Sequence, residues 1–139
     1  MNRRIHGAVL LAASAAAVLF APTTAAPASA ATPFKAPDVT FAGTGPGTVT
    51  ATLHNPNDQG QCWAEAGVGP DNNHVFFGGS RPESLANPGQ TIKTTLEGLE
   101  PGTTITARGG CAGDAGYQLS ELVTVTVPAA KPATGSFGG

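Results

Sequence analysis

Residues 96–106 read LEGLEPGTTIT, a turn-rich segment between two runs of β-forming residues. Gly98, Pro101 and Gly102 are typical turn residues, because glycine tolerates positive φ angles and proline presets the turn conformation. The runs on either side, residues 90–96 and 103–111, have the length and threonine content of β-strands. This stretch therefore predicts two strands joined by a loop over residues 97–102.

The same pattern continues outward in both directions. Residues 48–53 alternate strictly, with Val49, Ala51 and Leu53 on one face and threonines on the other. Similar runs predict strands at residues 39–41, 61–68, 74–77 and 122–127, the last with Val123, Val125 and Val127 facing inward. No segment has the apolar stripe of a helix. About seven short strands separated by turns are typical of an all-β sandwich, and we expect this fold class.

Length and composition limit the functional classes. The chain has 139 residues, 12% charged and 6% aromatic, with 19 glycines and 12 prolines, which suits one small domain rich in turns. Seven basic and nine acidic residues give a net charge of −2. Two of the arginines lie in the first four residues. No basic patch remains after them, so nucleic acid is not an expected partner.

The two ends differ in composition from the middle. Residues 1–30 have a positive start, an apolar run and a final Ala-Ser-Ala, which predicts a signal peptide cleaved after Ala30 and a secreted or cell-wall-associated protein. The apolar run is too short for a permanent anchor, so no transmembrane segment is expected after cleavage. We assign residues 31–37 to a Pro/Ala-rich lead-in, 38–128 to the sandwich and 129–139 to a disordered tail.

Cys62 and Cys111 are the two cysteines of the chain. An exported chain meets an oxidising environment, so an even number of cysteines favours pairing over two separate buried thiols. With a period of two, each cysteine falls on the more apolar face of its own strand. We therefore predict one disulfide between them.

The LEGLEPGTTIT segment resembles the turn that leads into the sixth strand of fibronectin type III domains, and the resemblance extends over residues 37–128. It implies an immunoglobulin-like or fibronectin type III-like sandwich in which the two cysteine-bearing strands are neighbours in one sheet. Two positions depart from the family pattern. Ile105 replaces its tyrosine and Leu53 replaces its usual tryptophan, so the hydroxyl brace of the tyrosine corner is missing.

One cluster of side chains is a candidate ligand site. The alternation places Trp63 and Glu65 on the outer face of their strand and Arg108 on the outer face of the neighbouring strand. An exposed tryptophan beside an arginine is a common centre of a binding surface and can stack on a sugar ring or a planar ligand. The alternative is that Trp63 lies under the Arg108 stem or a loop, with Glu65 and Arg108 as an ordinary cross-strand pair.

Other site types receive no support from the sequence. His54 and His74 lie in or beside loops without the ligand spacing of a metal centre, so no metal is expected. No nucleophile elbow or phosphate-binding loop is present, and both cysteines are assigned to the disulfide, so we expect neither an enzyme nor a cofactor. Gly109-Gly110 and Gly78-Gly79 are interpreted as bulges or turns.

The expected function is that of a non-enzymatic, exported binding module. Its partner is left open as a protein, a glycan or a small molecule. Residues 60–68, GQCWAEAGV, are locally similar to the neocarzinostatin family of apoproteins, which implies a small-molecule carrier as an alternative. A purely structural protein of the cell envelope is a further alternative.

Overall fold

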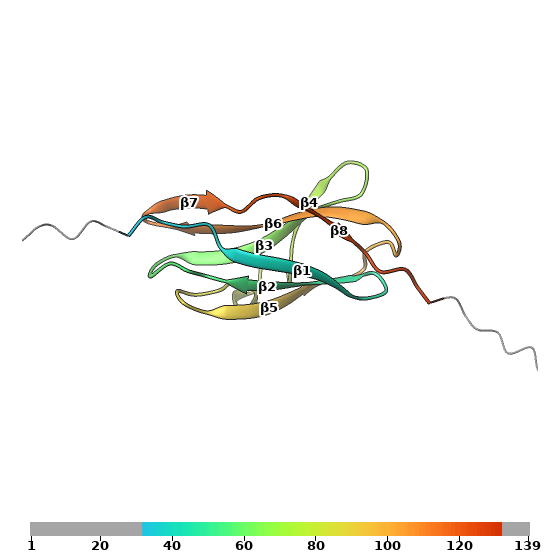
Figure 1. Ribbon diagram of the computed structural model, residues 1–139, viewed down its shortest axis with the longest axis horizontal. Helices are drawn as coiled ribbons and strands as arrows, with labels where there is room; N and C mark the ends of the chain where they lie inside the picture. Colours follow the sequence, from blue (N-terminus) through green and yellow to red (C-terminus); the bar gives the residue numbers. More distant parts are fainter. Residues whose placement is uncertain (1–31, 132–139) are drawn as a thin grey trace, which may run out of the picture. The chain divides into compact units, whose positions relative to one another are not determined.

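A computed structural model describes residues 32–131, which form a sandwich of two antiparallel sheets (Figure 1). One sheet has the order β1-β2-β5, and the other has the order β4-β3-β6-β7 with β8 also paired to β6. The strands are β1 (Asp38–Gly45), β2 (Thr48–His54), β3 (Gln61–Val68), β4 (Asn73–Phe76), β5 (Thr91–Leu96), β6 (Thr104–Gly113), β7 (Gly116–Leu119) and β8 (Val123–Thr126), with one short 3-10 turn at Pro82–Ser84. The all-β prediction is confirmed.

The core lies between the two sheets and follows the predicted alternation. Val49, Ala51 and Leu53 of β2 are fully buried, and the threonines between them are half-buried. Ile105 is also buried, so both positions that depart from the fibronectin pattern contribute apolar side chains to the interior. Burial of such side chains contributes about 1.5–3 kcal/mol each.

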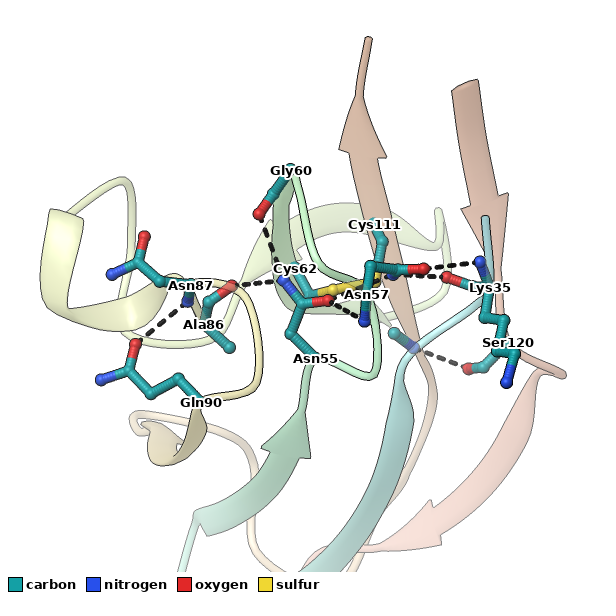
Figure 2. The surroundings of a disulfide bond; sticks show 11 residues. Lys35, Asn55, Asn57, Gly60, Cys62, Ala86, Asn87, Gln90, Cys111 and Ser120 are labelled. Carbon is teal, nitrogen blue, oxygen red and sulfur yellow. Dashed lines mark hydrogen bonds between the residues drawn. A yellow bond between two sulfur atoms is a disulfide. The ribbon is translucent and has the colours of Figure 1, made fainter. Parts of the chain in front are cut away.

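Strands β3 and β6 form the centre of the larger sheet, and Cys62 lies directly opposite Cys111 in their register. The two residues form the predicted disulfide and are completely buried. Figure 2 shows the bond at the end of the sandwich where the chain segments around Lys35, Asn55 and Ala86 meet. The neighbouring-strand arrangement implied by the family resemblance is therefore present.

Gly109 and Gly110 keep the regular register of β6, opposite Ala64 and Trp63. Their interpretation as a bulge or turn is wrong. A Cβ atom on Gly109 would lie 2.5 Å from Pro37 on the inner face, and one on Gly110 would lie 2.5 Å from the Trp63 ring on the outer face. Both positions require glycine because neighbouring side chains occupy the space on each side.

The last edge of the larger sheet is formed by two strands instead of the single predicted one. Strand β7 pairs with the end of β6 after a tight turn, and β8 pairs with its beginning, which raises the count from about seven to eight. Between them the backbone N–H of Ser120 donates to Gly109 O, and the Ser120 hydroxyl accepts from Gly109 N–H. Val123 lies opposite the buried Ala107 and so faces inward as predicted, but it is 42% exposed at this open edge.

The residues before β1 have no regular structure but are attached to the domain. Asn57 forms two hydrogen bonds with the backbone of Lys35, through its side-chain oxygen at 2.7 Å and its side-chain amide at 2.9 Å. The buried Asn55 donates to the carbonyls of Gly60 and Ala86 (Figure 2). These contacts join the lead-in, the loop after β2 and the segment before β5.

The predicted signal peptide, residues 1–30, lies outside the described residues, as does the predicted tail from residue 132. Within residues 32–131, no helix has the length and apolar character needed to cross a membrane.

The disulfide yields a stability prediction. It joins positions 49 residues apart, and closing a loop of that length stabilises a protein by about 4 kcal/mol in the chain-entropy model. The Cys62→Ala/Cys111→Ala double variant should therefore melt roughly 15 °C or more below the wild type in scanning calorimetry. Because both sulfur atoms are buried, a reductant should lower the wild-type melting temperature only after exposure to denaturant. A variant that melts within a few degrees of the wild type would contradict the prediction.

Candidate functional site

The three candidate residues meet on the outer face of the larger sheet. Glu65 on β3 lies directly opposite Arg108 on β6 and, on its other side, directly opposite Phe76 on β4. Trp63 lies two residues before Glu65 on the same strand face. The structure therefore brings Trp63, Glu65 and Arg108 together, as the alternation predicted.

Glu65 is the centre of a hydrogen-bonded cluster. Its Oε1 accepts a hydrogen bond from Arg108 Nε at 2.7 Å, and its Oε2 accepts one from Trp63 Nε1 at 2.7 Å. His74 Nε2 lies 3.0 Å from the same Oε2. Both carboxylate oxygens are thus engaged, and Glu65 is only 4% exposed.

This environment changes the acidity of Glu65. Burial alone would raise the pKa of the carboxyl group, because it disfavours the charged form. Hydrogen bonds from Trp63, Arg108 and His74, together with the attraction of His74, act in the opposite direction, and the net result is a lowered pKa. The carboxylate is therefore a stable anion that fixes three neighbouring side chains.

Trp63 lies against the sheet where β6 has no side chain. Its ring occupies the space beside Gly110, where an added Cβ would come within 2.5 Å, and its ring centroid is 5.7 Å from that of Tyr117 on β7. On the other side of the cluster the rings of His74 and Phe76 meet edge to face at 4.9 Å. Aromatic side chains therefore lie on both flanks of Glu65.

Glu65 is buried, and Trp63, expected from the sequence to be exposed, is only partly exposed, as is Arg108. The placement on the outer face was right, but side chains from adjacent strands cover the carboxylate. The Glu65–Arg108 pair matches the cross-strand alternative. His74, Phe76 and Tyr117 were not identified as site residues. Alternation within β4 could have placed the first two on one face, but only the register with β3 brings them to Glu65.

Two depressions adjoin the cluster. One, of about 310 Å³, is lined by the apolar side chains of Trp63, Phe76 and Leu85, together with Gly79 and Ser80. The other, of about 270 Å³, is more polar and is lined by Glu65, Ala66, Gly67, Asn72, His74, Thr106, Arg108 and Leu122. A larger groove of about 550 Å³ runs along β1 beside Ser120 and Val123, at the open edge between the sheets.

The two histidines of the domain have ordinary polar partners. His54 Nδ1 lies 2.9 Å from the Thr91 hydroxyl, and His74 contacts Glu65 as described above. Among residues 32–131, no three His, Cys, Asp or Glu side chains converge in a way that would hold a metal ion.

The Glu65 cluster yields a pH prediction. Because the pKa of folded Glu65 lies below its ordinary value of 4.5, its stabilising effect is complete above that pH and is lost as the pH falls through the lower folded pKa. Glu65→Gln should cost about 1–2 kcal/mol of unfolding free energy at neutral pH. Urea unfolding of both proteins at decreasing pH should show the difference shrinking. Glu97→Gln in an exposed turn is the control, and a constant difference at all pH values would contradict the assignment.

Gly110 yields a second prediction. Gly110→Ala should force Trp63 from its position and cost about 1–3 kcal/mol, as overpacking generally does. Gly45→Ala is a matched control, because the nearest atom to its added Cβ is 3.9 Å away. Urea unfolding followed by Trp63 fluorescence measures both the stability and the displaced ring. Equal stabilities for the two variants would contradict the close contact.

Comparisons with known proteins agree on the fold. No family model matches the chain, and no curated protein matches its sequence. Among solved structures, the sixth fibronectin type III domain of human fibronectin type III domain containing protein 3 is 19% identical, with a TM-score of 0.51 over 76% of this chain and 96% of that one. The fourth FNIII domain of a human protein is 18% identical, with a TM-score of 0.52 over 75% of this chain and 87% of that one. The described chain therefore has a fibronectin type III-like β-sandwich fold.

Proposed function

We propose that this chain is an exported, non-enzymatic binding module whose ligand-binding face is the outer surface of the β4-β3-β6-β7 sheet. The ligand group that suits this face is a flat ring, either a sugar ring or an aromatic group. Domains with this fold are generally interaction modules, and the fold alone does not select a ligand. The argument therefore rests on the side chains of the face.

The observation that carries the proposal is the distribution of exposed apolar side chains. Within residues 32–131 the large exposed apolar residues are Phe76, Tyr117, Leu122 and Val123. Phe76 lies opposite Glu65, and Tyr117 packs against Trp63. Leu122 lines the polar depression beside Glu65. Phe76 is 41% exposed and Tyr117 is 54% exposed. Aromatic groups gathered on one face, with an arginine among them, are typical of binding surfaces.

The cluster beneath these rings favours binding over simple structural support. Glu65 holds the Trp63 indole and the Arg108 side chain through hydrogen bonds of 2.7 Å. Side chains fixed before the ligand arrives lose little conformational entropy on binding, and this increases affinity. Both Glu65 oxygens and both cysteines are already engaged, which leaves none of them as a free acid, base or nucleophile for catalysis.

Export is supported by two independent features. The buried Cys62–Cys111 disulfide suits an oxidising compartment outside the cytoplasm. The first thirty residues have the composition of a signal peptide. We propose that the domain acts outside the cell, either released or held at the cell wall.

A small-molecule carrier is the second candidate function. The apolar depression lined by Trp63, Phe76 and Leu85 has a volume of about 310 Å³, at the lower limit of ordinary small-molecule pockets. This volume suits a single ring, whereas a larger chromophore would extend onto the sheet. The face is therefore better suited to one ring of a larger partner.

The proposal is tested by NMR titration with two ring probes, methyl β-glucoside and indole. Binding at the proposed face should shift the resonances of Trp63, Phe76 and Tyr117. Phe76→Ala should weaken the binding by about tenfold or more, the effect of removing an anchor side chain. Lys93→Ala, an exposed substitution on the other sheet, should leave the affinity unchanged. The melting temperature of each variant checks that it is folded.

The two probes distinguish the ligand classes. Preference for the glucoside supports a glycan partner, and preference for indole supports an aromatic group of a protein or small molecule. No binding of either probe, or shifts confined to the β1-β2-β5 sheet, would refute the proposed face.

A further inference from the structure

The polar depression on the same face has a distinct chemistry. It lies where Asn72, in the turn between β3 and β4, approaches Thr106 and Arg108 on β6. His74 forms one border, and Leu122, which is 60% exposed, forms another. The volume of about 270 Å³ is sufficient for a small polar group together with part of its carrier.

The carboxylate and side-chain amide oxygens around this depression already have partners. Glu65 Oε1 and Oε2 accept from Arg108, Trp63 and His74, as described above. Asn72 Oδ1 accepts from the Thr106 hydroxyl at 3.2 Å. A ligand that presents hydrogen-bond donors would therefore find few acceptors here.

Several donors, in contrast, remain available. Arg108 donates a hydrogen bond to Glu65 through Nε, and its two Nη groups make no hydrogen bond within the described residues. Asn72 Nδ2 likewise has no partner among residues 32–131. The two Nη groups form one edge of a planar guanidinium, and this edge matches the two oxygens of a carboxylate.

We propose that this depression binds a carboxylate group of the partner, held by the Nη edge of Arg108 and by Asn72 Nδ2. The inference deepens the proposed function, because it assigns an acidic group to a ligand of the same face. Glu65 positions Arg108 by accepting a hydrogen bond from its Nε. The two Nη groups then remain available to the ligand. The buried Glu65 carboxylate balances the Arg108 charge, so we expect weak binding of a lone carboxylate and stronger binding of a partner that also contacts the aromatic rings.

The backbone of the turn supports a fixed position for Asn72. This residue has a positive φ of 51°, and its side chain lies over Gly67, where an added Cβ would overlap its oxygen. Glycine at position 67 therefore allows the Asn72 side chain to lie close to the sheet and near Arg108. Asparagine and aspartate both tolerate this backbone conformation, which makes Asn72→Asp a conservative test substitution.

The test uses sodium acetate as the probe in an NMR titration of the exported domain at constant ionic strength. Acetamide, with the same shape and no charge, is the matched control probe. Acetate should shift the Arg108 side-chain N–H signals and the Asn72 side-chain amide, and acetamide should not. Sodium sulfate, a tetrahedral anion, tests whether the planar shape is required.

Two variants report on the geometry. Asn72→Asp replaces a donor by an acceptor and a negative charge, and it should weaken acetate binding by about tenfold or more. Arg108→Lys retains the charge without the planar edge and should have a similar effect. Lys93→Ala on the other sheet should not change the affinity.

The outcomes separate this inference from the proposed function. Acetate binding at Arg108 supports the inference even if the ring probes fail to bind. Ring binding without acetate binding refutes the inference and leaves the binding face intact. Equal shifts with acetamide, equal or stronger binding of sulfate, or full acetate affinity in Asn72→Asp would each overturn it.

Discussion

The pairing of β3 with β6 is the constraint on which the rest of the domain depends. Seven consecutive residues of β3 lie opposite β6 in unbroken register. That register places the cysteines opposite each other on the inner face and places Glu65 opposite Arg108 on the outer face. A shift by one residue would exchange the two faces and separate both pairs. The core and the candidate site are therefore fixed by the same set of backbone hydrogen bonds.

The two faces of this strand pair use different physical interactions. Inside, a covalent bond and small apolar residues such as Ala64 and Ala66 pack against the opposite sheet. Outside, a buried anion holds polar atoms of three side chains. A buried charge is tolerated only when its partners are complete, so the outer cluster has little freedom to rearrange. Such a fixed cluster would suit the proposed binding face, because side chains that are already ordered lose little conformational entropy on binding.

Much of the fold could be predicted because alternation with a period of two is a local property. It placed seven strands, the faces of β2, and the cysteine pair correctly. Strand β7 was missed because its residues, Gly116–Leu119, are mostly exposed and have no apolar alternation. Val123 lies on the predicted inner face, opposite the buried Ala107, but it is 42% exposed because it lies at the open edge between the two sheets.

The candidate site was less predictable, since its properties depend on neighbouring strands. Alternation assigns Glu65 to a side of the sheet, but it does not reveal that Trp63, His74 and Arg108 cover it. The glycines at 109 and 110 were misread for a related reason. Their role is to leave room for Pro37 on one face and Trp63 on the other, and these contacts exist only after the strands have paired.

The divided edge formed by β7 and β8 has a consequence for self-association. A long, straight edge strand offers a row of unpaired N–H and C=O groups on which a second molecule can add a strand. Here each edge segment has only four residues. Between them, the backbone N–H and the hydroxyl of Ser120 are hydrogen-bonded to the backbone of Gly109. A strand from another molecule would find only a short run of groups in register. This side of the sandwich is therefore a poor template for strand addition by another molecule.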